Sequence, residues 1–243
     1  MQTKNLVYIV LFLATISITS SCQAQNGKKE RSSAGQTKEN RNVSGFNSLD
    51  LSISANVLLK QGTGTSLELE GDANDLEKIE TVVSGSTLKI KTRPGSWNLG
   101  KITVYLTMSE IENLTISGSG SIKSETGIKA NNLNLVISGS GNINLPDLSA
   151  KDVSSVISGS GNISFSGNGS SSYSKMVVTG SGNINAENFN ANSADVRITG
   201  SGNCKVNAND KLDVHITGSG SVFYKGKAMI NANVTGSGKV RQI

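Results

Sequence analysis

The chain has 243 residues, a formal net charge of +5 and an aromatic content of 4%. Such a small basic excess and so few aromatic side chains give little support to nucleic-acid binding, which relies on a dense basic surface and often on stacking rings. The length suits one domain of roughly 200 residues behind a short N-terminal segment.

The N-terminus has the features of an export signal. Residues 1–21 contain one basic residue, Lys4, then an apolar run and then small residues, which is the order found in a secretory signal peptide. The apolar run is too short for a lasting membrane-spanning helix. Small residues directly before Cys22 resemble a bacterial lipobox, so we expect Cys22 to be lipidated and the protein to be held at the outer membrane, facing the periplasm or the surface. The alternative is ordinary cleavage near Ala24, with Cys22 incidental.

Residues 22–42 form a polar segment. Between Gln23 and Arg41 the sequence is mainly Lys, Glu, Gln, Ser and Asn, with almost no apolar residues to build a core. This composition predicts a flexible tether between a lipid anchor and a folded domain.

Residues 43–114 alternate apolar and polar residues as strands do, but their glycine corners are irregular. We expect these residues to form the atypical first coils and the cap of the repeats that follow, because a terminal repeat lacks a neighbour on one side. A short helix is predicted from Asp72 to Glu80, with Asp72 as the N-cap.

A Gly-Ser-Gly triplet recurs seven times in residues 115–243, at spacings of 21, 20, 21, 20, 18 and 18 residues. A period near 20 residues indicates stacked supersecondary units. Glycine permits positive φ and close backbone approach, so each triplet predicts a corner. The corner glycines are Gly118, Gly120, Gly139, Gly141, Gly159, Gly161, Gly180, Gly182, Gly200, Gly202, Gly218, Gly220, Gly236 and Gly238.

Apolar residues flank each corner, three positions before and three positions after its central serine, as in Ile137 and Ile143. Positions six apart share a face in strands of period two, so both side chains can point into one core. One unit cannot bury its own apolar face, but stacked coils about 4.8 Å apart can. We therefore predict an all-β, single-domain β-solenoid over residues 43–243. A stack of antiparallel hairpins with Gly-Ser-Gly turns is the alternative.

The repeats resemble the head-GIN-domain family of autotransporter adhesins, common among surface and secreted proteins of Bacteroidetes-type bacteria. The likeness runs from Phe46 to the C-terminus and rests on the lead-in at residues 46–51 and on Gly-Asn-Ile triplets such as Gly141-Asn142-Ile143. The resemblance implies a right-handed parallel β-helix, an adhesin-like role and no established catalytic residues.

The residues themselves offer no catalytic or metal-binding constellation, so we predict neither an enzyme nor a cofactor. The single histidine, His215, should point outward between Val214 and Ile216. Cys204 stands where other copies have Ile and should be a buried thiol. A polysaccharide lyase would have to assemble its site from acidic residues scattered along the chain, namely Asp147, Asp152 and Asp195.

Two functions from different classes remain open at this point. The first is a non-catalytic surface or envelope solenoid that binds or displays, as an adhesin does, with a glycan or a protein as ligand. The second is a carbohydrate-binding or carbohydrate-active β-helix protein. Lys239 and Arg241 alternate with apolar residues in the last strand, which is a common guard against edge-to-edge pairing, so we expect a monomer.

Overall fold

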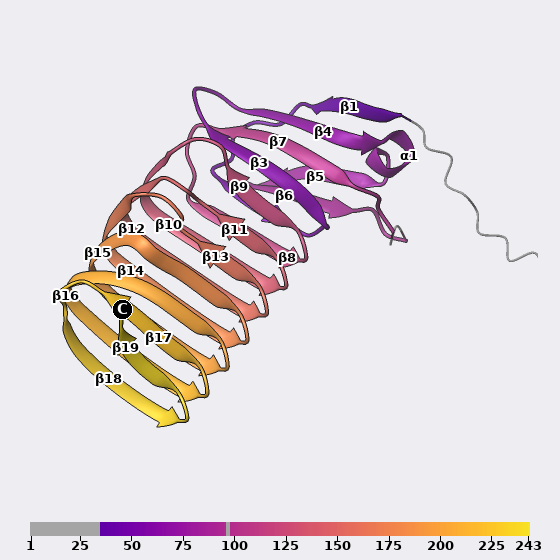
Figure 1. Cartoon of the computed structure of the whole chain (residues 1–243). Helices are drawn as coiled ribbons and strands as arrows, with labels where there is room; N and C mark the ends of the chain where they lie inside the picture. Colours follow the sequence, from indigo (N-terminus) through magenta and orange to yellow (C-terminus); the bar gives the residue numbers. More distant parts are fainter. Residues whose placement is uncertain (1–34, 96–97) are drawn as a thin grey trace, which may run out of the picture. The chain divides into compact units, whose positions relative to one another are not determined.

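The computed structural model describes residues 35–95 and 98–243, which form a stack of β-strand coils with one short helix (Figure 1). The predicted signal peptide and Cys22 lie outside the described residues. In the repeat region every strand pairing is parallel and like residues are aligned, so that Ile137 lies beside Ile157 and Gly139 beside Gly159, with register shifts only within the pairing of Asn183–Gly200 and Asn203–Gly218. The predicted β-solenoid is therefore confirmed, and the alternative of antiparallel hairpins is wrong.

One side of the solenoid, here called the long face, consists of long parallel strands that end at the Gly-Ser-Gly corners. Their apolar residues alternate with polar ones, and the apolar set points inward. The strands of the long face in the repeat region are β8 (Asn113–Gly118), β10 (Ile128–Gly139), β12 (Leu148–Gly159), β14 (Gly169–Gly180), β15 (Asn183–Gly200), β16 (Asn203–Gly218) and β18 (Met229–Gly236).

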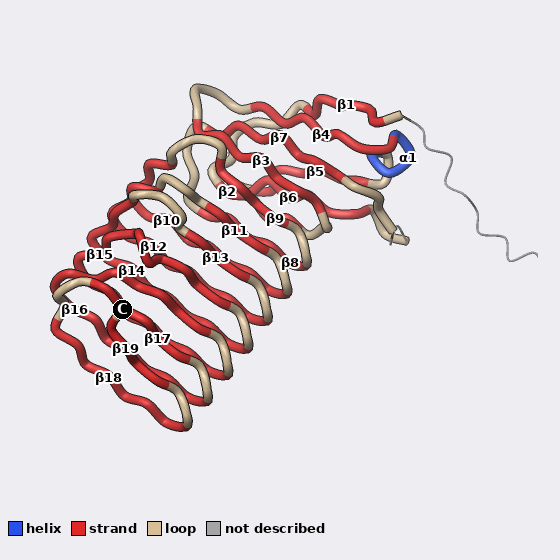
Figure 2. The backbone as a smooth tube through the Cα atoms, viewed as in Figure 1, coloured by secondary structure: helices blue, strands red, loops and turns tan. Residues whose placement is uncertain are grey.

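Beyond each corner the chain enters a second side, here called the short-strand face. Its strands also pair in parallel, as Asn142–Asn144 with Asn162–Ser164. The first residues of β15 and β16 belong to it as well, because both strands continue around the coil (Figure 2). The strands that lie wholly on this face are β9 (Ser121–Ser124), β11 (Asn142–Asn144), β13 (Asn162–Ser164), β17 (Ser221–Lys225) and β19 (Lys239–Gln242).

The glycine corners stack directly on one another. Gly159 has a φ of 135°, and a Cβ atom added to it would overlap the carbonyl oxygen of Gly139 in the coil below. That carbonyl accepts a hydrogen bond from the Ser160 amide at 2.9 Å. Glycine is therefore required at this position for two reasons, the backbone conformation and the close approach of the next coil.

The core is a set of aligned apolar ladders inside the coils. Ile137, Ile157 and Val178 are buried in adjacent coils, as are Ile163 and Ile184 on the other side of the corner. Each coil buries its inner residues only through contact with its neighbours, which is how solenoids gain stability.

The lead-in coils do not stack in chain order. The first coil, β2 and β3, pairs in parallel with β8 and β9 on one side and with β6 and β7 on the other. The chain thus forms the coil of β2 and β3 first and stacks the coil of β6 and β7 on one side of it. It then stacks β8, β9 and the repeats on the opposite side. The bounds are β2 (Ser48–Leu51), β3 (Ala55–Gln61), β6 (Thr87–Thr92) and β7 (Ile102–Met108).

Antiparallel strands extend the sheet beyond these coils. β4 (Ser66–Asp72) pairs with β7, and β5 (Ile79–Ser84) pairs with β6. The helix between them, α1 (Ala73–Leu76), is shorter than the predicted segment, but Asp72 is its N-cap and accepts a hydrogen bond from the Asn74 amide at 2.9 Å. Residues 43–114, predicted as irregular first coils and a cap, thus consist of parallel coils extended by antiparallel strands.

Part of the predicted tether is also a strand. β1 (Gln36–Arg41) pairs antiparallel with β4 along its whole length, which differs from the expectation of a flexible segment up to residue 42. Its residues are exposed or half-buried, so apolar burial does not hold it in place. The free edge of β4 supplies backbone hydrogen bonds instead, and Lys38 Nζ lies 2.6 Å from Glu68 Oε1.

Candidate functional site: the outer surface of the long face

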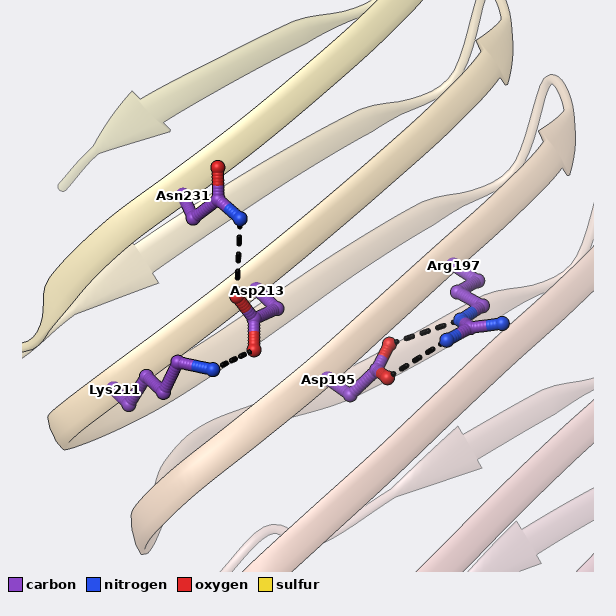
Figure 3. Close-up of polar contacts among 5 residues, drawn as sticks. All are labelled: Asp195, Arg197, Lys211, Asp213 and Asn231. Carbon is purple, nitrogen blue, oxygen red and sulfur yellow. Dashed lines mark hydrogen bonds and ion pairs between the residues drawn. The ribbon is translucent and has the colours of Figure 1, made fainter.

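The outer surface of the long face carries a cluster of polar side chains near the C-terminal coils, here called the charged patch: Asp195, Arg197, Lys211, Asp213 and Asn231. Figure 3 shows that these side chains come from three adjacent strands, β15, β16 and β18. Asp195, Asp213 and Asn231 occupy equivalent positions in successive coils and form one column. Parallel, in-register stacking thus brings together residues 18 positions apart in the sequence.

The acidic groups of the charged patch are paired within it. Arg197 donates from Nε and Nη2 to the two carboxylate oxygens of Asp195, both at 3.2 Å. Lys211 Nζ lies 2.6 Å from Asp213 Oδ2, and Asn231 Nδ2 lies 3.4 Å from Asp213 Oδ1. The hydrogen bond from Lys211 lowers the pKa of the Asp213 carboxyl below its usual value. The Asp213 carboxylate is therefore held in the ionised form by its neighbouring cation.

Tyr173 in β14 adds an aromatic ring to this surface, and the residue is 39% exposed. Partial burial, followed by the negative charge of Asp195, raises the pKa of its hydroxyl. An exposed ring near carboxylate and guanidinium groups can both stack on a ligand and hydrogen-bond with it.

A groove of about 980 Å³ lies on the same side, where the irregular coils meet the regular ones. One wall is the connection between β7 and β8, with Glu110 and Glu112, and the other is the start of β10 and β12, with Lys129 and Lys151. Four asparagines and a glutamine also line it: Asn113, Asn131, Asn132, Asn134 and Gln61.

The opposite, short-strand face carries a structural ladder of asparagines. Asn162 donates to Asn142 at 2.9 Å, Asn183 donates to Asn162 at 3.1 Å, and Asn203 donates to Asn183 at 3.2 Å. Each bond joins one coil to the next, so these amides stabilise the stack and leave little capacity for a ligand.

A cluster of charges also joins three coils. Glu187 is bound by Lys205 at 2.9 Å and by Lys225 at 2.6 Å. The hydrogen bonds from Lys225 and Lys205 lower the pKa of Glu187 to about 2. Since both carboxylate oxygens are engaged, Glu187 is unsuited to act as a proton donor near neutral pH.

The residues singled out in the sequence do not form one site. Cys204 is a buried thiol with a pKa raised by burial to about 12, and His215 is exposed on the long face. Asp152 lies two coils from Asp195, in a different column, and Asp147 lies in the connection before β12.

The described residues contain no metal-binding cluster and no helix suited to span a membrane. Within residues 35–95 and 98–243, no three His, Cys, Asp or Glu side chains gather as a metal ion would require. In the same part of the chain no helix is long and apolar enough to cross a membrane.

Sequence reasoning missed the groove and the coil-to-coil hydrogen bonds of the asparagine ladder. The ladder has a visible signal, because Asn follows the Gly-Ser-Gly triplet at Asn142, Asn162, Asn183 and Asn203. The groove has none, since its walls come from segments that meet only through the stacking of the irregular coils.

This architecture defines a parallel β-solenoid protein with an exposed polar face. Residues 45–228 match the model of a family described as "Putative auto-transporter adhesin, head GIN domain". The chain belongs to this family, as the Gly-Asn-Ile triplets indicated. No protein of curated function matches the sequence.

Solved structures of Bacteroidetes proteins have the same fold. A "putative adhesin" from Bacteroides fragilis NCTC 9343 has a TM-score of 0.81 and 25% identity, covering 86% of this chain and 98% of that one. A "putative lipid binding protein" from Parabacteroides distasonis ATCC 8503 has a TM-score of 0.73 and 26% identity, covering 86% and 97%. A "putative adhesin" from the same strain has a TM-score of 0.69 and 20% identity, again covering 86% and 97%.

Proposed function

We propose that the protein is a non-catalytic, adhesin-like binding protein of the cell envelope, exported by its signal peptide and anchored at the outer membrane through lipidated Cys22. Membership of an adhesin family and the fold shared with proteins named adhesins support a surface or secreted role. The polar composition of residues 23–34 supports a spacer between the anchor and the solenoid.

The main support for a binding role is the outer surface of the long face, where the strands of successive coils are aligned. Equivalent positions recur there at each coil, about 4.8 Å apart, which gives an extended ligand a regularly spaced contact surface. Flat, polar surfaces of this kind suit adhesion, in which many weak contacts add up.

The state of the carboxylates supports a non-catalytic role. A glycosidase needs two carboxyl groups facing one bond, one of them protonated near neutral pH. In the charged patch Asp195 and Asp213 are each paired with a cation on the same strand. The lowered pKa of Asp213 disfavours a general-acid role for that carboxyl group.

The test is a glycan array read together with a reducing-end assay. We expect the purified protein to bind at least one class of envelope or host polysaccharide and to release no reducing ends from it. Release of reducing ends in proportion to protein concentration would contradict the non-catalytic role, and absence of binding to cells and glycans alike would contradict the adhesin-like role.

A further inference from the structure

The groove between the irregular and regular coils contains hydrogen-bonding groups that the fold does not use. The side chains of Glu110, Glu112, Lys129 and Lys151 make no ion pair or hydrogen bond with the described residues, although all four line one groove. In the charged patch, by contrast, Asp195 and Asp213 are each neutralised by a neighbour.

The walls of the groove are held in place by Gln61. Its Nε2 donates to the Lys129 carbonyl at 2.9 Å and to the Ser109 carbonyl at 3.3 Å, and its Oε1 accepts from the Lys129 amide at 2.7 Å. One side chain therefore fixes both walls relative to each other, so the groove is preformed and a ligand has little ordering to impose.

The lining indicates the chemistry of the ligand. Two carboxylates and two ammonium groups give the groove a formal charge of zero, and the amides of Asn131 and Asn132 supply further donors and acceptors. A polyanion would meet Glu110 and Glu112, and an acyl chain would leave the amides and charges unsatisfied. A neutral ligand rich in hydroxyl groups can pair with all of them.

The groove continues into the columns of the long face. Asn113 and Asn134, at the groove, are the first two members of a column of equivalent positions that passes through later coils to the charged patch. The six steps from Asn113 to Asn231 span roughly 29 Å at the spacing of neighbouring strands. One hexose unit of an extended polysaccharide is of similar length to one step.

We propose that the groove is the anchoring subsite for a neutral, linear oligosaccharide whose chain runs from the groove along the columns toward the charged patch. The proposal rests on the adhesin-like function proposed above and specifies its ligand. Asn132 and Glu112 contact the sugar in the groove, and Tyr173 contacts it one coil beyond β12.

The experiment is calorimetric titration of the purified full chain with neutral linear hexasaccharides: α- and β-glucan, mannan, galactan and N-acetylhexosamine oligomers. Oligogalacturonate and phosphatidylglycerol vesicles are the anionic and lipid comparisons. We expect a neutral hexasaccharide to bind with an affinity that changes less than twofold on raising the salt concentration, because no net charge is neutralised. The double variant Glu112→Gln, Asn132→Ala should bind it at least tenfold more weakly.

The control double variant Glu77→Gln, Asn209→Ala changes two exposed residues outside the groove and should bind as the unchanged protein does. Equal binding by the groove variant and the control would overturn the groove assignment while leaving the adhesin-like function standing. Preference for oligogalacturonate or for vesicles would overturn the neutral-glycan class. If the unchanged protein binds none of these probes and does not bind cells, both the inference and the proposed function are overturned.

Discussion

Asn162 donates a hydrogen bond from Nδ2 to Oδ1 of Asn142 at 2.9 Å, although the two residues are 20 positions apart in the sequence. The bond repeats along the short-strand face, and the last acceptor, Asn203 Oδ1, receives the Ser221 amide at 3.2 Å. The Asn of the Gly-Asn-Ile triplet is therefore a coil-to-coil connector, which gives the family signature a structural role in this chain.

Replacement of Asn162 by Ala should weaken the stack. The change removes one bond donated to Asn142 and one accepted from Asn183, and at an exposed site each is worth on the order of 1 kcal/mol. We expect a lower urea midpoint than for Ser160→Ala, a change at the exposed centre of the same corner. Identical midpoints for the two variants would show that the amide ladder adds nothing to stability.

Alkaline pH should destabilise the solenoid through Cys204. Burial raises the pKa of this thiol from 9.0 to about 12, so the folded state favours the neutral form. Its contribution to stability is complete below pH 9 and is lost as the pH rises toward 12, at about 1.4 kcal/mol per pH unit.

The matched variant for this test is Cys204→Ile, which we expect to fold because Ile184 fills the equivalent position in the adjacent coil. Urea midpoints of both proteins should be compared at neutral pH and at pH values above 9. The unchanged protein should lose more stability in alkali than the variant, and parallel losses would assign the effect to other groups.

The sequence predicts the repeated coils well because each one is specified locally. Glycine corners and alternating apolar residues such as Ile137 and Ile143 are short-range patterns, and a constant period forces like residues into ladders. The N-cap at Asp72 is local in the same way, and it too was predicted correctly.

The order of the first coils could not be predicted, because stacking order is not a local property. Nothing in the alternation of β2 shows that it pairs with both β6 and β8. The groove depends on this order, since Gln61 is 68 residues from Lys129 and the two meet only when β3 and β10 are placed. The candidate site was therefore beyond sequence reasoning, whereas the fold that supports it was not.

An Asp at position 163 should unfold the solenoid. Ile163 is 1% exposed and lies in register between Ile143 and Ile184, so a carboxylate there would be buried without a partner. The cost is several kcal/mol, which is a large share of the stability of a typical domain. Circular dichroism melts of Ile163→Asp and of the conservative control Ile163→Val measure it, and similar melting temperatures would refute the inward assignment.

Lipidation of Cys22 is tested by metabolic labelling with palmitate in a bacterial host. We expect the unchanged protein to be labelled and to sediment with membranes, and Cys22→Ala to be unlabelled. The buried Cys204 provides the internal control, because Cys204→Ile should retain the label. Equal labelling of the Cys22→Ala variant, or no labelling of any of the three proteins, would contradict the lipoprotein assignment.

The last prediction concerns β19, which pairs with β17 along one edge. Within the described residues no strand pairs with its other edge, and the neighbouring β18 exposes Ile230 and Val234 to 39% and 38%. Such an edge is a template for pairing with a second copy. Lys239 and Arg241 are exposed on β19 and would be brought against like charges in a copy docked edge to edge, which opposes association.

We therefore expect the unchanged protein to be monomeric and the double variant Lys239→Val, Arg241→Val to self-associate. The variant loses the charge repulsion between two edges and gains β-branched residues, which favour strand pairing. Because association joins two copies, the effect should grow with protein concentration. Sedimentation velocity over a hundredfold concentration range measures it, with Lys239→Gln, Arg241→Gln to separate loss of charge from gain of apolar surface. If both variants sediment as the unchanged protein does, the two basic residues do not guard this edge.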